Sequence, residues 1–119
     1  MKLCITSQGD DLSADVDPRF GRARYFIIYD DETEEHEVVD NEQNMNAAGG
    51  AGVQSATNVV DMGCDWVISG HMGPKALSVL KAGDVKIAVG AEGTVEEAIQ
   101  AFQDGELEEV EDADVSSRW

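Results

Sequence analysis

Hydrophobic and β-branched residues first gather in three short runs, each bounded by polar residues. Their spacing predicts strands at residues 2–7, 24–30 and 36–40. A tight polar turn at residues 31–34 joins the second run to the third, so these two strands should form an antiparallel hairpin. Residues 8–23 are mostly polar and contain glycine and proline, which predicts a loop between the first two strands.

Helical and strand-like patterns alternate in the rest of the chain. Apolar residues at helical spacing predict three helices, at residues 50–63, 74–83 and 94–102. A glycine closes the first helix, a proline opens the second, and a Thr-x-x-Glu capping box opens the third. Continuous apolar runs between these helices predict two buried parallel strands, at residues 65–70 and 85–89.

This order of elements predicts an α/β fold. Helical connections between strands require right-handed parallel crossovers. The simplest arrangement is a five-stranded mixed sheet in the order 3-2-1-4-5, with strand one central, strand two antiparallel, and three helices. We therefore assign residues 1–107 to a single α/β domain and residues 108–119 to an acidic, loosely ordered C-terminal tail.

The carboxyl edge of the parallel strands is the expected binding site. Open α/β sheets bind ligands in the crevice at this edge. The loop at residues 8–23 begins and ends there, and the N-termini of all three helices should point to it. Free N–H groups and positive dipole ends favour an anion. The residues expected to bind it are Ser7, Gln8, Arg19, Phe20, Gly21, Arg22, Arg24, Gly50, Gly52, His71, Met72, Gly73 and Thr94.

The charge of the chain supports a local anion site on a strongly acidic protein. The formal net charge is -17, which disfavours binding to nucleic acid or to anionic membranes. Three of the eight basic residues, Arg19, Arg22 and Arg24, nevertheless fall within one short loop. A structural alternative is that Arg22 and Arg24 form solvated salt bridges with Asp15 or Asp17. The absence of a long apolar segment predicts a cytoplasmic protein.

Other motifs leave structural alternatives open. Cys4 and Cys64 lack a C-x-x-C spacing and are expected to pack as small buried residues. The Gly-Gly-Ala-Gly segment at residues 49–52 could hold a phosphate or simply ease a turn, because it lacks the Lys-Ser/Thr of a P-loop. His71 is a candidate ligand or a structural histidine. No nucleophile or general base can be named, which indicates a non-catalytic protein.

Four ordered segments resemble the dinitrogenase iron–molybdenum cofactor-binding family. They are RFGRARYF, NMNAAGGAGVQSA, DWVISGHMGPKAL and GTVEEAIQAF, and the resemblance extends over about residues 1–107. It implies a ribonuclease-H-like three-layer domain. It also implies a non-catalytic carrier of an anionic metal–sulfur cluster, either a molybdenum–copper sulfide cluster or one like the iron–molybdenum cofactor. As a single domain with an acidic body, this chain is most similar to the orange-protein type of sulfate-reducing bacteria.

The resemblance has one departure that affects the ligand set. Many members of the family have histidine where this chain has Arg19, which leaves His71 as the candidate metal ligand at the edge. Sulfides of a preassembled cluster can instead accept hydrogen bonds from arginine and backbone N–H groups. The alternative function is an adaptor domain that docks on a partner ATPase or a metallocluster maturation protein.

Overall fold

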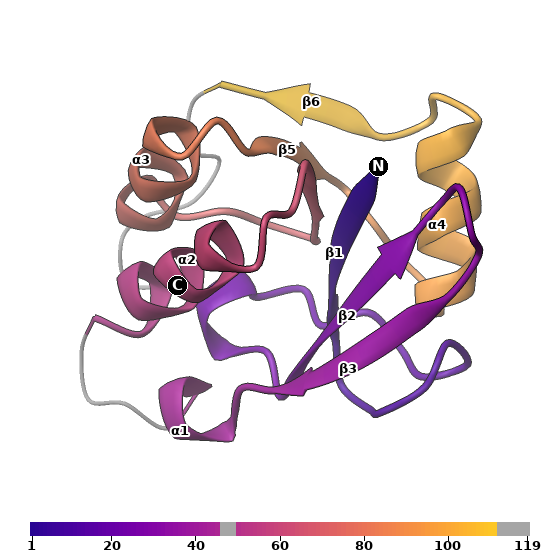
Figure 1. Ribbon diagram of the computed structural model, residues 1–119, viewed down its shortest axis with the longest axis horizontal. Helices are drawn as coiled ribbons and strands as arrows, with labels where there is room; N and C mark the ends of the chain where they lie inside the picture. Colours follow the sequence, from indigo (N-terminus) through magenta and orange to yellow (C-terminus); the bar gives the residue numbers. More distant parts are fainter. Residues whose placement is uncertain (46–49, 112–119) are drawn as a thin grey trace.

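The computed structural model describes residues 1–45 and 50–111, which form an α/β fold around a six-stranded mixed sheet. The strand order is β3-β2-β1-β4-β5-β6 (Figure 1). Strand β1 is parallel to β4, β4 is parallel to β5, and the other three pairs are antiparallel. The strands are β1 (Lys2–Ser7), β2 (Tyr25–Asp30), β3 (His36–Asp40), β4 (Trp66–Ile68), β5 (Lys86–Val89) and β6 (Glu108–Val110).

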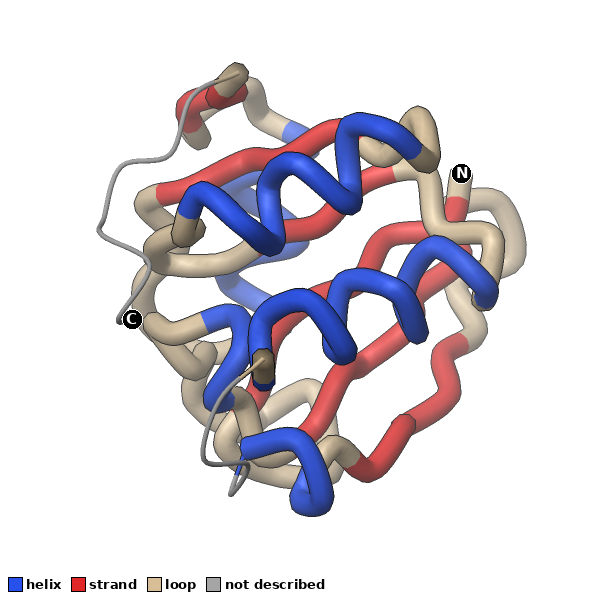
Figure 2. The backbone as a smooth tube through the Cα atoms, turned by 90° about the vertical axis from the view of Figure 1, so that its left-hand side faces the viewer, coloured by secondary structure: helices blue, strands red, loops and turns tan. Residues whose placement is uncertain are grey.

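Helices cover both faces of the sheet. Helices α2 and α3 lie side by side on one face (Figure 2), and α4 lies on the other (Figure 1). A single 3-10 turn, η1, interrupts the loop between β1 and β2. The helical elements are η1 (Phe20–Arg22), α1 (Glu42–Met45), α2 (Ala51–Asp61), α3 (Pro74–Ala82) and α4 (Val95–Gln103). None of these helices is long and apolar enough to cross a membrane.

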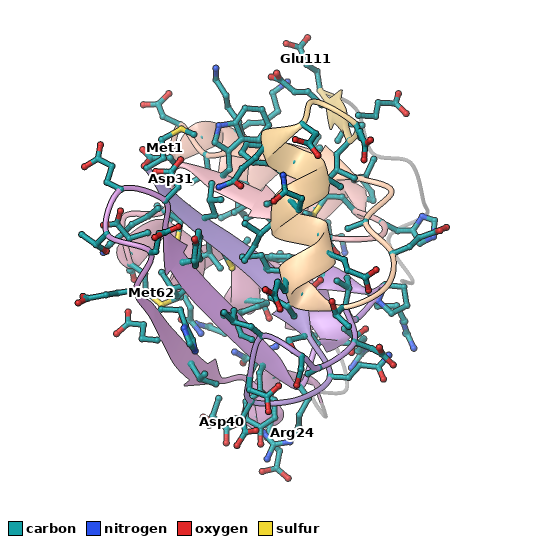
Figure 3. The ribbon with its side chains drawn as sticks, turned by 90° about the vertical axis from the view of Figure 1, so that its right-hand side faces the viewer. Met1, Arg24, Asp31, Asp40, Met62 and Glu111 are labelled. Carbon is teal, nitrogen blue, oxygen red and sulfur yellow. The ribbon has the colours of Figure 1, made fainter. Side chains whose placement is uncertain are left out.

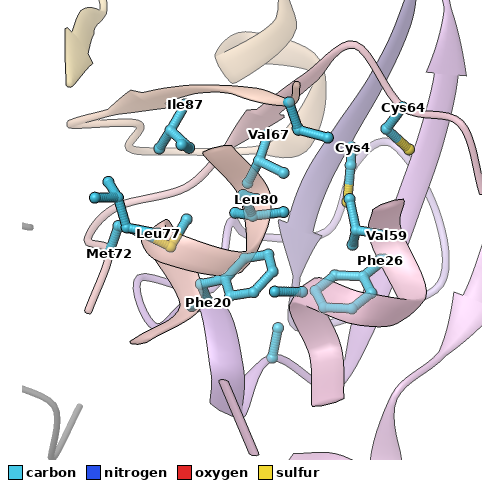
Figure 4. Packing of buried hydrophobic residues seen from close by; sticks show 14 of the residues in the cluster. Cys4, Phe20, Phe26, Val59, Cys64, Val67, Met72, Leu77, Leu80 and Ile87 are labelled. Atoms are coloured by element: carbon cyan, nitrogen blue, oxygen red, sulfur yellow. The ribbon is translucent and has the colours of Figure 1, made fainter. Parts of the chain in front are cut away.

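The central strand β1 is buried on both faces, as alternation along a strand requires. Cys4 faces α2 and α3, where it joins a cluster that includes Phe20, Phe26 and Met72 (Figure 4). Leu3 and Ile5 face α4 and join the second cluster. Two separate apolar clusters, one on each face, therefore make a three-layer domain.

The predicted order of the first five strands is confirmed, but the predicted numbers of strands and helices are wrong. A sixth strand, β6, pairs antiparallel with β5, and it lies in the segment expected to be an acidic tail. Its sequence is Glu-Glu-Val, so it lacks the apolar alternation that marks a strand. Residues 112–119 of the expected tail lie outside the described residues, and the ribonuclease-H-like assignment stays a prediction.

A fourth helix, α1, occupies part of the segment predicted to be a polar loop. Its first turn is held by side chains rather than by an apolar face. The Asp40 carboxylate accepts the backbone N–H of Glu42 at 2.8 Å, and the Asn44 side chain donates to Asn41 Oδ1 at 3.0 Å. A helix of four residues has no periodicity that the sequence pattern can reveal.

The predicted helix ends are confirmed where the structure describes them. Thr94 Oγ1 accepts the backbone N–H of Glu97, and the Glu97 side chain accepts the N–H of Thr94, which completes the capping box of α4. Gly63 follows α2 with a φ of 72°, a conformation that glycine adopts without strain. Pro74 is the first residue of α3.

Candidate functional site

The loop after β1 closes the N-terminus of α4. The backbone N–H groups of Val95 and Glu96 donate to the carbonyl oxygens of Ala14 and Leu12, each at 2.9 Å. The next N–H of the helix donates to the side chain of Thr94. The first turn of α4 thus uses its N–H groups within the protein. Of the three helix N-termini expected to be available to a ligand at this edge, those of α2 and α3 remain.

Helices α2 and α3 begin side by side at the same edge of the sheet. A Cβ atom placed on Gly52, in the first turn of α2, would lie 3.4 Å from the Cβ of Ala76 in the first turn of α3. Among the described residues, no side chain caps either N-terminus, where Gly50 and Gly73 hold the N-cap positions. Two positive dipole ends therefore face the same place, which favours an anion.

The turn η1 presses directly on the start of α2. A Cβ atom on Gly21 would lie only 2.8 Å from the Cα of Gly52 and 2.9 Å from its backbone N. Phe20 anchors this turn because it is only 2% exposed and its ring stacks on Phe26 with centroids 5.4 Å apart. Phe20 and Gly21 therefore act as positioning residues, which hold the flanking arginines beside α2.

The structure brings Arg19 and His71 together. They pair in a parallel β-bridge, and the backbone N–H of His71 donates to the carbonyl oxygen of Pro18 at 2.9 Å. A Cβ atom on Gly70 would lie 2.7 Å from the Cα of Pro18, so the two segments are in close contact. His71 is half-buried at this edge, whereas the Met72 side chain is 0% exposed and belongs to the core.

Arg24 lies at the edge but has acidic partners of its own. Its Nη1 is 2.6 Å from Asp40 Oδ1 (Figure 3), and its Nη2 is 3.5 Å from Glu42 Oε2. The guanidinium also lies over the ring of Tyr25. The N–H of Glu42 and the Arg24 guanidinium hold the pKa of Asp40 below its usual value. These partners differ from Asp15 and Asp17, the alternatives considered from sequence.

The two residues expected at the end of β1 shape the following loop. The buried Ser7 hydroxyl donates to the carbonyl oxygen of Gly9 at 2.7 Å, and the exposed Gln8 donates its backbone N–H to Asp15. Asp17, which the sequence reasoning did not place in the site, is half-buried beside Arg19 and accepts its N–H at 3.0 Å. Desolvation raises the pKa of Asp17 above its usual value.

A buried asparagine links the elements around the site, and the sequence reasoning missed it. Asn41 is buried, its Nδ2 donates to the carbonyl oxygen of Ala23 at 2.8 Å, and its Oδ1 accepts the Ser55 hydroxyl at 3.3 Å. Ala23 follows η1 and Ser55 lies on α2, so Asn41 joins these two elements. Local sequence contains no signal for this role, because Asn41 follows the mixed strand His-Glu-Val-Val-Asp and precedes further polar residues.

The arrangement offers hydrogen-bond donors rather than a set of metal ligands. Within residues 1–45 and 50–111, no group of three or more His, Cys, Asp or Glu side chains is placed to hold a metal ion. The edge instead presents backbone N–H groups, Arg19 and Arg22 on either side of Phe20 and Gly21, and His71. Gly49, the first residue of the predicted Gly-Gly-Ala-Gly segment, lies outside the described residues.

Known proteins have this fold and are similar in sequence over nearly the whole chain. The orange protein from Desulfovibrio gigas, solved in its apo form, is 34% identical, with a TM-score of 0.92 and 96% of each chain covered. A Thermotoga protein described as NifB and solved by NMR is 43% identical, with a TM-score of 0.82 and coverage of 92% of this chain and 93% of that one.

Sequence comparisons agree with the structural ones. An uncharacterized protein of Methanocaldococcus jannaschii is 32% identical over 114 residues, which cover 93% of this chain and 92% of the relative. Residues 1–105 match the model of the family described as dinitrogenase iron-molybdenum cofactor. The chain therefore belongs to the dinitrogenase iron–molybdenum cofactor family.

Proposed function

We propose that this protein binds an anionic metal–sulfur cluster without covalent attachment and carries it to or from a partner. One observation carries the proposal: the N-termini of α2 and α3, which no side chain of the described residues caps, meet at one edge of the sheet, with Gly52 close to Ala76. The family and the similarity to the orange protein support a cluster as the ligand. The proposed cargo is a molybdenum–copper sulfide cluster or one like the iron–molybdenum cofactor.

The chemistry of this edge suits sulfide as the acceptor. Sulfides on the surface of a cluster carry negative charge and accept hydrogen bonds, so the metals inside need no protein thiolate. Each charge-assisted hydrogen bond contributes about 1.5–3 kcal/mol. The chain as a whole has a net charge of -17, so its surface away from the edge repels an anion and confines binding to the edge.

The proposed contacts divide into donors and positioning residues. Arg19 and Arg22 are the cationic donors, the N–H groups of the first turns of α2 and α3 are the neutral ones, and His71 is a donor or a metal ligand. Phe20, Gly21 and Met72 position this set from the core side. Arg24 is engaged by Asp40 and Glu42, Ser7 and Gln8 shape the neighbouring loop, and Thr94 caps α4.

The proposed role is non-catalytic. A carrier needs a site that binds and releases its cargo, and hydrogen-bonded sulfides can be released without breaking a metal–protein bond. The alternative is an adaptor that docks on a partner ATPase or a cluster maturation protein through the same edge. The two functions differ in whether the purified protein takes up a cluster.

Uptake of a synthetic cluster tests the proposal. The protein is titrated with tetrathiomolybdate and Cu(I) under anaerobic conditions, and charge-transfer absorption is followed after gel filtration. We expect a coloured protein with bound molybdenum and copper, and uptake weakened by about a hundredfold or more in Arg19→Gln/Arg22→Gln, which loses two charge-assisted contacts of about 1.5 kcal/mol or more each.

Arg24→Gln is the matched control, because it removes one positive charge of the same loop that is already paired with Asp40. We expect it to take up the cluster nearly as well as the wild type. If Arg24→Gln weakens uptake as much as the double variant does for each charge removed, only net charge matters and the assigned contacts are wrong. A folded wild-type protein that stays colourless and metal-free would refute the carrier function and favour the adaptor.

A further inference from the structure

The two cysteines, sixty positions apart in sequence, are neighbours in the structure. Cys4 lies on the central strand β1 and is 0% exposed, and Cys64 lies just before β4 and is 5% exposed. Both belong to the cluster under α2 and α3, and their side chains lie next to each other at its margin (Figure 4). Neither forms a disulfide in the structure, so the pair is a dithiol.

Backbone and side-chain contacts fix the segment that carries Cys64 against β1. The Asp65 N–H donates to the carbonyl oxygen of Lys2 at 2.8 Å, and the Asp65 carboxylate accepts the N–H of Lys2 at the same distance. The Lys2 ammonium donates to the carbonyl oxygen of Met62 at 3.1 Å. Residues on both sides of Cys64 are therefore held to the start of β1, which keeps the two thiols in contact.

The two thiols have different surroundings. A side-chain hydrogen bond with Cys4 and the charge of the Lys2 ammonium lower the pKa of Cys64, against desolvation and the charges of Asp65 and Glu37. Burial raises the pKa of Cys4 well above its usual value. Cys64 is thus the thiol more readily converted to the nucleophilic thiolate, and Cys4 is the protonated partner behind it.

A groove lies at the start of β1, on the side of the β2–β3 hairpin. It has a volume of about 400 Å³ and is lined by the start of β1 and the β2–β3 hairpin, including Lys2, Ile28 and Glu37. Lys2 and Glu37, which line the groove, are also among the charged groups that act on Cys64. This groove lies at the opposite end of β1 from the proposed cluster site.

We propose that Cys4 and Cys64 form a reversible thiol–disulfide pair that reacts with small disulfides entering this groove. The Cys64 thiolate attacks one sulfur of the small disulfide, a mixed disulfide forms, and one small thiolate leaves. Cys4 then loses its proton, which goes to solvent or to the second leaving thiolate, and attacks Cys64. The products are a Cys4–Cys64 disulfide and two small thiols, so two protein thiols are oxidised and one small disulfide is reduced.

Oxidised glutathione is the probe. The folded, reduced protein is incubated with it anaerobically and analysed by intact mass and by peptide mapping, with circular dichroism to verify that the fold persists. We expect the loss of two hydrogens in mass, a cross-link between the peptides of Cys4 and Cys64, and full reversal by dithiothreitol. Cys4→Ser should stop at a single glutathione adduct on Cys64, and Cys64→Ser should gain none.

Two results would overturn the proposal. In one, the folded wild type keeps both thiols reduced under conditions that oxidise the same protein after denaturation. The two cysteines would then be buried core residues without a redox role. In the other, the wild type accumulates the glutathione adduct on Cys64 without proceeding to the cross-link. Both readouts use the wild-type protein, so instability of either serine variant does not affect the test.

Discussion

A methyl group at position 21 probes the contact between η1 and α2 most directly. In Gly21→Ala the new Cβ would lie 2.8 Å from the Cα of Gly52 and 2.9 Å from its backbone N. Both atoms belong to the backbone of α2, so no side chain can rotate away, and η1 must retreat by roughly half an ångström. Overpacking of this kind costs about 1–3 kcal/mol in the free energy of unfolding.

Two assays follow from this displacement. Thermal unfolding by circular dichroism should show a fall in Tm of about 4–12 °C for a domain of this size. Titration with tetrathiomolybdate and Cu(I) should show uptake weakened by about tenfold, because η1 carries Arg22 and follows Arg19, and the loss of one charge-assisted contact is about 1.5 kcal/mol.

Gly52→Ala is the matched control for stability. Its new Cβ would meet the Cβ of Ala76 at 3.4 Å, an ordinary contact, and alanine is the better helix former. Its free energy of unfolding should stay equal to that of the wild type or rise by up to about 1 kcal/mol. If Gly21→Ala matches the wild type in both Tm and uptake, the close approach of η1 to α2 does not shape the site.

Three further substitutions separate the site from its surroundings. Thr94→Ala removes the cap of α4 and should lower the free energy of unfolding by about 1 kcal/mol, measured in urea, with uptake unchanged. Asn41→Ala leaves the Ala23 carbonyl and the Ser55 hydroxyl without their partner, so it should cost about 1–3 kcal/mol and weaken uptake. Asp17→Asn removes a negative charge beside Arg19, so uptake should strengthen. Burial raises the pKa of Asp17 above its ordinary 3.8. The folded protein therefore loses free energy of unfolding as the pH rises through the folded-state pKa and the buried carboxyl ionises. Asp17→Asn has no such carboxylate, so it should be more stable than the wild type at neutral pH.

Each of these outcomes has a clear opposite. Weaker uptake by Thr94→Ala would show that the N-terminus of α4 is part of the binding site. Unchanged uptake by a destabilised Asn41→Ala would mean that the link between η1 and α2 is not needed for binding. An Asp17→Asn variant less stable than the wild type at neutral pH would show that the carboxylate contributes more as an acceptor for Arg19 than its desolvation costs.

The sequence could predict the central architecture because β1, β2, β4 and β5 are apolar runs, and because a tight turn joins β3 to β2. Strands β1 and β3 have the predicted bounds, and the order of the first five strands follows from their connections. Strand β6 could not be predicted, because only Val110 of its three residues is apolar and its pairing with β5 depends on the tertiary fold. Pattern reasoning finds the exposed edge strand β3 because a short turn joins it to β2, and it misses β6, which has neither a hairpin turn nor an apolar run.

The sequence could predict the edge of the sheet at which the candidate residues gather, but not which hydrogen-bond donors are available there. The topology brings the loop after β1, the start of α2 and the segment around His71 to one edge, as expected. Which donors stay available there depends on contacts between distant residues. The pairing of Leu12 and Ala14 with the first turn of α4, and of Arg24 with Asp40, has no signature in local sequence.

The sheet ends in two edge strands that a second copy could extend. Among the described residues these edges are β3, which carries Glu37 and Asp40, and β6, which carries Glu108 and Glu109. An edge strand of one molecule would have to align its carboxylates with those of another, and this repulsion opposes strand pairing between copies. The acidity of these two strands thus opposes aggregation through the open edges of the sheet, most strongly at low ionic strength.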